Sequence, residues 1–163
     1  MKRTACRANC LDASALIKLY VTEDGSDQLK KYLDHEPTRY TTPFCYFETL
    51  NILKVKWLYR KEITQPEYHE ASFSLTAWFS SMNSDIKDLD FTSPYVFIEV
   101  QRIAKLYKLD LSDAFQIMSV KQGYFSPLVQ DSKTILVTAD KDLANAARQE
   151  GLRVWNLLSE TEP

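Results

Sequence analysis

Short runs of apolar and β-branched residues alternate along the chain with longer segments in which apolar residues recur at helical spacing. The clearest strand pattern is Thr-Ile-Leu-Val-Thr at 134–138, which is apolar enough for the centre of a sheet. Weaker strand patterns occur at 7–11, 39–42, 85–89 and 153–156. Strands that alternate with helices are typical of parallel sheets, so the pattern predicts an α/β three-layer sandwich with a central five-stranded parallel sheet.

Helical segments separate these strands, and several carry start or stop signals. Thr42-Pro43 offers a hydroxyl cap followed by a proline whose missing N–H costs nothing there, and Thr64 has a capping-box spacing to Glu67. Ser112 is placed to cap a further helix, and Gly151 to end one. The predicted helices are 13–21, 26–35, 43–61, 64–82, 94–108, 112–124 and 141–150.

Two of the predicted helices are rich in aromatic and large apolar side chains. Their candidate core positions are Phe44, Phe47, Leu50, Ile52 and Val55 on the first, and Tyr68, Phe73, Leu75, Trp78 and Phe79 on the second. The aromatic side chains could instead form a dimer or partner surface. We expect more of the set formed by Tyr46, Trp57, Tyr68, Phe73, Trp78 and Phe79 to lie in the core.

Length and composition fit one soluble domain spanning residues 1–163. No window approaches the roughly 20 apolar residues that span a bilayer, and the basic N-terminus lacks the apolar core of a secretory signal. A cytoplasmic protein without a membrane partner is therefore expected. Three cysteines without repeated spacing argue against disulfides, so we expect reduced, structural thiols at Cys6, Cys10 and Cys45.

The net charge of −2 gives no general preference for nucleic acid, since phosphate contacts need Lys and Arg. A local basic patch could still form around Lys54, Lys56, Arg60 and Lys61. Lys18, His35 and His69 have no partner pattern and are expected on the solvated surface. The function therefore has to be argued from the acidic residues.

Acidic residues follow two of the predicted strands directly: Asp12 after the first and Asp140 after 134–138. Ligands bind at the carboxyl ends of parallel strands, so these two acids converge if their strands are neighbours across a switch point. Glu48 lies on the first turns of the helix after the second strand, and Asp113 starts the helix before 134–138. All four are then expected near one end of the sheet.

Clustered carboxylates repel one another and need a cation or protons at neutral pH. Hard oxygen ligands suit Mg²⁺ or Mn²⁺, which can activate water and neutralise a phosphate leaving group. Taken singly, Asp12, Asp113 and Asp140 are better explained as helix caps. Glu48 alone is open between an unremarkable exposed acid and a buried one that needs a partner.

Four short segments together resemble the PIN-domain family, especially the VapC-type toxins of toxin–antitoxin pairs. They are Cys10-Leu11-Asp12-Ala13-Ser14-Ala15-Leu16-Ile17-Lys18-Leu19-Tyr20, Phe47-Glu48-Thr49-Leu50, Leu111-Ser112-Asp113-Ala114-Phe115-Gln116 and Val137-Thr138-Ala139-Asp140-Lys141-Asp142-Leu143. The resemblance spans nearly the whole chain. It implies strand order 3-2-1-4-5, an acidic Mg²⁺ or Mn²⁺ pocket and endonucleolytic cleavage of RNA.

The resemblance also implies roles for single residues. Asp12, Glu48, Asp113 and Asp140 are the implied metal ligands. Ser14 and Thr138 are supporting hydroxyls, and Asp142 is a peripheral acid. We prefer Asp113 to the nearby Asp110, because Ala114 follows it and Ser112 can cap the helix. A toxin would pair with an antitoxin that inserts Arg or Lys among the carboxylates, and would form a homodimer.

Other folds with acids at strand ends fail at named positions. A phosphoacceptor receiver domain needs adjacent acids after its first strand and a lysine after its last, whereas alanine follows Asp12 and Trp155-Asn156 offers no lysine. A haloacid-dehalogenase-like phosphatase needs a second Asp where Ser14 stands. A PIN-like module that binds RNA or protein without cutting stays open, because it can keep every ligand.

Overall fold

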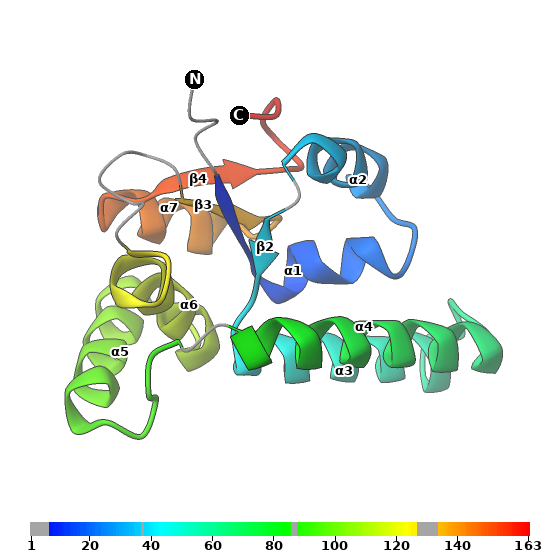
Figure 1. Ribbon diagram of the computed structural model, residues 1–163, viewed down its shortest axis with the longest axis horizontal. Helices are drawn as coiled ribbons and strands as arrows, with labels where there is room; N and C mark the ends of the chain where they lie inside the picture. The colour runs from blue at the N-terminus through cyan, green and yellow to red at the C-terminus, as the bar shows by residue number, and fades with distance from the viewer. Residues whose placement is uncertain (1–6, 37, 86–87, 127–133) are drawn as a thin grey trace.

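A parallel sheet runs through the protein in the computed structural model, which describes residues 7–36, 38–85, 88–126 and 134–163 (Figure 1). Within these ranges the strands are β1 (Ala8–Leu11), β2 (Arg39–Tyr40), β3 (Thr134–Thr138) and β4 (Arg153–Asn156). They lie in the order β2-β1-β3-β4, and all three pairings are parallel. The α/β class and the relative order of these four strands are as predicted.

The predicted strand at 85–89 is wrong for the residues that the structure describes. Asp85 ends a helix, Asp88 and Leu89 have no regular structure, and residues 86–87 lie outside the described ranges. The Asp88 carboxylate instead accepts a hydrogen bond from Ser119 on a neighbouring helix, and Leu89 packs against the core. Asp88 and Leu89 are therefore held by side-chain contacts and do not form a fifth strand of the described sheet.

The helices begin and end close to the predicted positions. They are α1 (Ala13–Leu16) with the 3-10 turn η1 (Ile17–Leu19), α2 (Ser26–His35), α3 (Pro43–Leu58), α4 (Gln65–Asp85), α5 (Pro94–Tyr107), α6 (Leu111–Gln122) and α7 (Lys141–Gln149). Thr42 caps α3 through its hydroxyl, and Thr64 and Glu67 form the predicted capping box. Gly151 follows α7 with φ +82°, a conformation that glycine adopts without strain.

Two helix boundaries differ from the prediction in ways that matter for the site. The expected continuous helix 13–21 tightens into η1 and ends at Leu19. Helix α6 begins at Leu111, so Asp110 and not Ser112 occupies the N-cap position. Ser112 is therefore free to use its hydroxyl elsewhere.

Buried side chains form one core on each face of the sheet. Alternate residues of a strand point to opposite faces, so Leu136 joins the core under α5, α6 and α7, while Ile135 and Val137 join the core under α1, α2, α3 and α4. All five residues of β3 are buried, as expected of a central strand. Helices on both faces give the predicted three layers (Figure 1).

The aromatic residues divide between helix packing and exposure. Helices α3 and α4 lie side by side (Figure 1), where Tyr46 stacks on Phe79 and Trp57 on Tyr68, with ring centroids 4.1 and 4.6 Å apart. The core prediction is wrong for Phe44, Phe47 and Phe73, which are 38%, 67% and 76% exposed. Phe47 and Phe73 are mostly exposed, whereas Phe44 still contacts Phe91 and the buried Phe115 edge to face, with ring centroids 5.3 and 5.1 Å apart.

The remaining single-residue expectations are mostly confirmed. Cys10 and Cys45 are buried free thiols, whereas Cys6 lies outside the described residues. His35 and His69 are exposed. The expectation for Lys18 is wrong, because its side chain is buried and its ammonium pairs with Glu23 at 2.7 Å. None of the helices within the described ranges has the length and apolar content to cross a bilayer.

Candidate active site

Asp12 stands at the carboxyl end of β1 and also caps α1. Its Oδ1 accepts the N–H of Ala15 at 2.8 Å, its Oδ2 accepts the hydroxyl of Thr138 at 2.6 Å, and the hydroxyl of Ser14 lies 2.8 Å from both oxygens. The side chain is almost fully buried. The Asp12 carboxylate therefore caps α1 and is also part of the candidate site.

Asp140 reaches the same edge from β3. Strands β1 and β3 are neighbours, with Leu11 opposite Val137, so Asp12 and Asp140 leave the sheet side by side. Asp140 caps α7 by accepting the N–H groups of Asp142 and Leu143 on its Oδ1, at 2.7 and 2.9 Å. Only one of its two carboxylate oxygens is used in this cap.

Two hydroxyls join these strand ends. Ser14 accepts the N–H of Ala139 at 2.8 Å, and Thr138 accepts the N–H of Asp140 at 2.9 Å. Because each hydroxyl also contacts Asp12, they fix the Asp12 carboxylate relative to the backbone that carries Asp140. Asp142 is exposed and meets the site only through its N–H bond to Asp140, as a residue at the rim.

Glu48 and Asp113 approach from the helices α3 and α6. The Glu48 residue is exposed as a whole, but its carboxyl group is partly buried. This burial is the main reason that the pKa of the carboxyl is raised, and the nearby charge of Asp110 is the second. A hydrogen bond from Ser112 acts in the opposite direction and lowers the pKa. Asp113 is half-buried in the first turn of α6. Asp113 is not the helix cap, so the capping explanation is wrong for this acid.

The electrostatics indicate that the four acids lie near one another, together with Asp110. Burial, followed by the charges of Asp12, Glu48, Asp140 and Asp110, raises the pKa of Asp113 from its ordinary value of 3.8 to about 7. Burial likewise raises the pKa of Asp12, its hydrogen bonds oppose this, and the resulting pKa is about 6. Acids that raise one another's pKa lie within electrostatic reach, so the fold gathers the four residues that the sequence singled out.

The donor set suits a hard divalent cation. Among the residues that the structure describes, no group of three or more Asp, Glu, His or Cys side chains is drawn close enough to hold an ion together. Mg²⁺ keeps several of its waters and is commonly held by one or two carboxylates plus substrate phosphate, so it does not need such a group. Carboxylates with raised pKa values and one free Asp140 oxygen therefore fit a hydrated Mg²⁺ or Mn²⁺.

A buried amide that sequence reasoning missed connects three of the acid-bearing elements. Gln116 on α6 donates to the carbonyl of Leu11 and to the sulfur of Cys10, both at 3.0 Å, and accepts the thiol of Cys45 at 3.1 Å. Leu11 precedes Asp12, Cys45 lies three residues before Glu48, and Gln116 lies three residues after Asp113. The sequence feature that could have pointed to Gln116 is a polar residue within the mainly apolar run 114–120.

Comparisons with known proteins agree with this architecture. The family model described as "PIN domain" matches residues 10–149. None of the curated proteins matches the chain. The crystal structure of PAE2754 from Pyrobaculum aerophilum aligns with a TM-score of 0.52 and 24% identity over 86% of each chain, a likeness that shows the fold alone. Since the family match includes all four gathered acids, the chain belongs to the PIN-domain family, whose members are typically nucleases.

Proposed function

We propose that the protein is a metal-dependent endoribonuclease that hydrolyses RNA phosphodiester bonds. The observation that carries the proposal is the placement of Asp12 and Asp140 at the carboxyl ends of the neighbouring strands β1 and β3, with Glu48 and Asp113 close enough to act on the same group of charges. Carboxylates that repel one another in this way are stabilised by a divalent cation, and a substrate phosphate can complete the cation's coordination.

The proposal gives Asp12, Glu48, Asp113 and Asp140 the role of metal ligands. A bound Mg²⁺ or Mn²⁺ would supply a nucleophilic water and neutralise charge on the scissile phosphate. Ser14 and Thr138 hold the Asp12 carboxylate in one orientation through their hydroxyls. Asp140 presents the oxygen that its cap leaves free, and Asp142 stays at the rim.

We further propose that the protein is the toxin of a VapBC-type pair acting on RNA in the cytoplasm. An antitoxin that places Arg or Lys in the crevice would complement its four carboxylates. Exposed apolar side chains on α5, including Phe97, Ile98 and Leu106, support a homodimer contact, because large apolar patches commonly mark interfaces.

The test is cleavage of single-stranded RNA by the purified protein with Mg²⁺ or Mn²⁺, compared with chelator and with Asp12→Asn. We expect cleavage by the wild type with metal and loss of it in both controls. Cleavage that persists in chelator, or in a folded Asp12→Asn variant, contradicts the proposal.

The alternative is a PIN-like module that binds RNA or protein without cutting. It is favoured by one observation, namely that no three acids in the described residues lie close enough to hold an ion together. The same assay separates the two, because such a module binds RNA without metal-dependent cleavage.

A further inference from the structure

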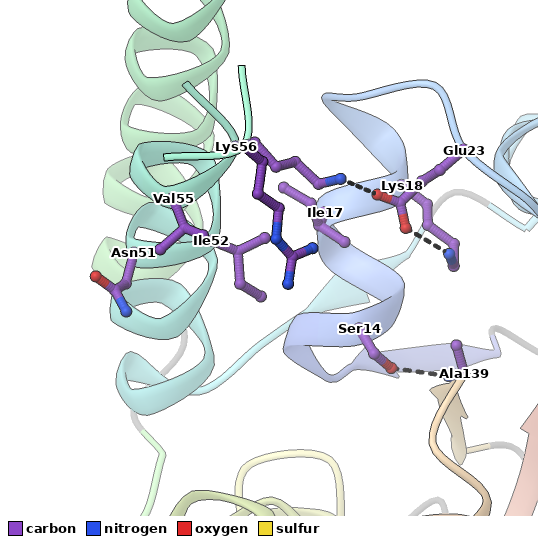
Figure 2. A pocket seen from close by; sticks show the side chains of 10 residues that line it. Ser14, Ile17, Lys18, Glu23, Asn51, Ile52, Val55, Lys56 and Ala139 are labelled. Carbon is purple, nitrogen blue, oxygen red and sulfur yellow. Dashed lines mark hydrogen bonds and ion pairs between the residues drawn. The ribbon is translucent and has the colours of Figure 1, made fainter. Parts of the chain in front are cut away.

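A second hollow of about 540 Å³ opens beside the acidic crevice, between η1 and α3 (Figure 2). Ser14 and Ala139, which belong to the acidic site, line one end of it. Ile17, Ile52 and Val55 form an apolar wall. The hollow thus adjoins the acidic site and falls within the usual size range of small-ligand pockets.

The charge of this hollow is opposite to that of the crevice. Its lining carries the three cations Lys18, Lys56 and Arg60 against the single acid Glu23. Glu23 lies between both lysines, 2.7 Å from Lys18 and 3.1 Å from Lys56 (Figure 2), and these contacts lower the pKa of its carboxyl. Glu62 also pairs with Lys56 and Arg60, so three cations stand against two acids, and an excess of positive charge remains beside the acidic residues of the site.

The three cations differ in their freedom to meet a ligand. The side chains of Lys18 and Lys56 are 5% and 12% exposed, and Lys56 also pairs with Glu62 at 2.5 Å. Arg60 is 63% exposed, and among the described residues it forms one long ion pair, a 3.8 Å contact with Glu62. The guanidinium of Arg60 is therefore the lining cation most available to an anion, with Lys56 held in a fixed position behind it.

We propose that this hollow binds one nucleotide of the RNA strand next to the scissile bond. Arg60, supported by Lys56, receives the backbone phosphate, while the nucleoside lies against the wall of Ile17, Ile52 and Val55. This inference rests on the proposed function and specifies its substrate contacts. It also accounts for RNA binding by a chain whose net charge is negative.

Charge decides between RNA and a protein segment as the occupant. A basic antitoxin segment is attracted by the four carboxylates, but the excess of cations in the hollow repels it. An RNA strand is attracted by the hollow directly, and by the crevice once a divalent cation is bound. A positively charged hollow next to an acidic metal site therefore suits RNA: one phosphate binds in the hollow while the scissile phosphate lies at the metal.

The test measures binding of a fluorescently labelled single-stranded RNA over a series of salt concentrations. Chelator is present throughout, so that metal-dependent cleavage does not occur. The main variant is Arg60→Gln, since this side chain is exposed and its replacement leaves the core untouched. Lys54→Gln is the matched control, because Lys54 is exposed near the end of α3, six residues before Arg60, and does not line the hollow. Arg60→Lys tests rescue by a retained charge.

We expect Arg60→Gln to weaken binding severalfold and to reduce the slope of log affinity against log salt by about 0.7, the value for one lost single-strand phosphate contact. Lys54→Gln should leave the slope unchanged, and Arg60→Lys should restore much of it. In steady-state cleavage with Mg²⁺, Arg60→Gln should raise KM with little change in kcat, because it removes binding remote from the reacting atoms.

The inference is overturned if the salt dependence of RNA binding has the same slope in Arg60→Gln as in the wild type. It is also overturned if Lys54→Gln loses as much RNA affinity as Arg60→Gln. Tighter binding of an arginine-rich peptide to Arg60→Gln, with RNA affinity unchanged, also overturns it and assigns the hollow to a protein partner. If Arg60→Gln binds RNA like wild type while wild type cleaves and Asp12→Asn does not, the subsite fails alone. If the RNA slope falls as expected but nothing is cleaved, the nuclease proposal fails and the subsite stands.

Discussion

Asp140 combines two tasks in one carboxylate. One oxygen caps α7, and the other is not used in the cap and is the proposed metal ligand. Asparagine also caps helices well, so a change to Asn removes the charge and keeps the cap. The two tasks can therefore be separated by a single substitution.

We predict that Asp140→Asn lowers RNA cleavage at least about a hundredfold, because a proposed metal ligand loses its charge. Its unfolding free energy should stay within about 1 kcal/mol of wild type. Asp142→Asn is the control, since Asp142 is exposed two residues away and should keep nearly full activity. A folded Asp140→Asn variant that cleaves at the wild-type rate removes Asp140 from the site.

Asp113 makes the metal-free protein sensitive to pH. Its pKa is about 7 in the folded protein, well above its ordinary value of 3.8. Between about pH 4 and pH 7 the unfolded chain releases a proton that the folded protein retains, so the free energy of unfolding falls as pH rises. Asp12, with a pKa of about 6, acts in the same direction.

Asp113→Asn is therefore predicted to stabilise the metal-free protein at pH 8. We expect a gain of about 1–2 kcal/mol, reduced by solvent screening because Asp113 is only half-buried. The gain should vanish near pH 3, below the ordinary value of 3.8, where Asp113 is protonated in both states. Urea unfolding of wild type and variant at both pH values checks this, and an Asp113→Asn variant no more stable than wild type at pH 8 contradicts it.

Gln116 is predicted to be structurally essential despite its distance from solvent. Gln116→Leu leaves the Leu11 carbonyl with only its bond from Thr41 and removes the bonds to Cys10 and Cys45, so we expect a loss of about 2–3 kcal/mol. Gln122→Leu, on the exposed part of the same helix, should cost less than about 0.5 kcal/mol. Equal denaturation midpoints for the two variants would show that the buried network is dispensable.

At the scale of elements, the α3–α4 hairpin depends on ring stacking between its two helices. We predict that Phe79→Ala, which removes the stack on Tyr46, destabilises the protein by about 2–3 kcal/mol. Phe73→Ala on the same helix should have an effect below about 0.5 kcal/mol, because Phe73 is 76% exposed. Thermal unfolding of both variants tests the difference, and a larger loss for Phe73→Ala would reverse our assignment of the packed face.

Most element boundaries followed from local chemistry. The Thr42-Pro43 start, the Thr64–Glu67 capping box and the Gly151 stop act within one turn, so the sequence reports them directly. The strand expected at 85–89 failed because strand formation depends on a partner, and Asp88 bonds to Ser119 instead. The Ser112 cap failed because an equally suitable residue, Asp110, lies two positions earlier.

At the scale of the whole molecule, a divalent cation should stabilise the folded state. The acids are gathered only by the fold, so the proposed Mg²⁺ or Mn²⁺ would bind the native protein in preference to the unfolded chain. We predict that metal at about a hundredfold above its Kd raises unfolding free energy by about 2.7 kcal/mol at pH 8. Calorimetry with and without chelator measures this, and the shift should shrink in Asp113→Asn. Identical melting temperatures with and without metal would contradict the proposed centre.

The sequence by itself determined the α/β class, the helix caps, the buried central strand β3 and the identity of the four acids. These follow from periodicity and from contacts between residues close in the chain. The tertiary structure decided which faces are covered, that Lys18 is buried against Glu23, and that Gln116 joins β1, α3 and α6. It also decided that a basic hollow lies beside the acidic crevice, because that juxtaposition depends on packing η1 against α3, and no local pattern encodes the distance between them.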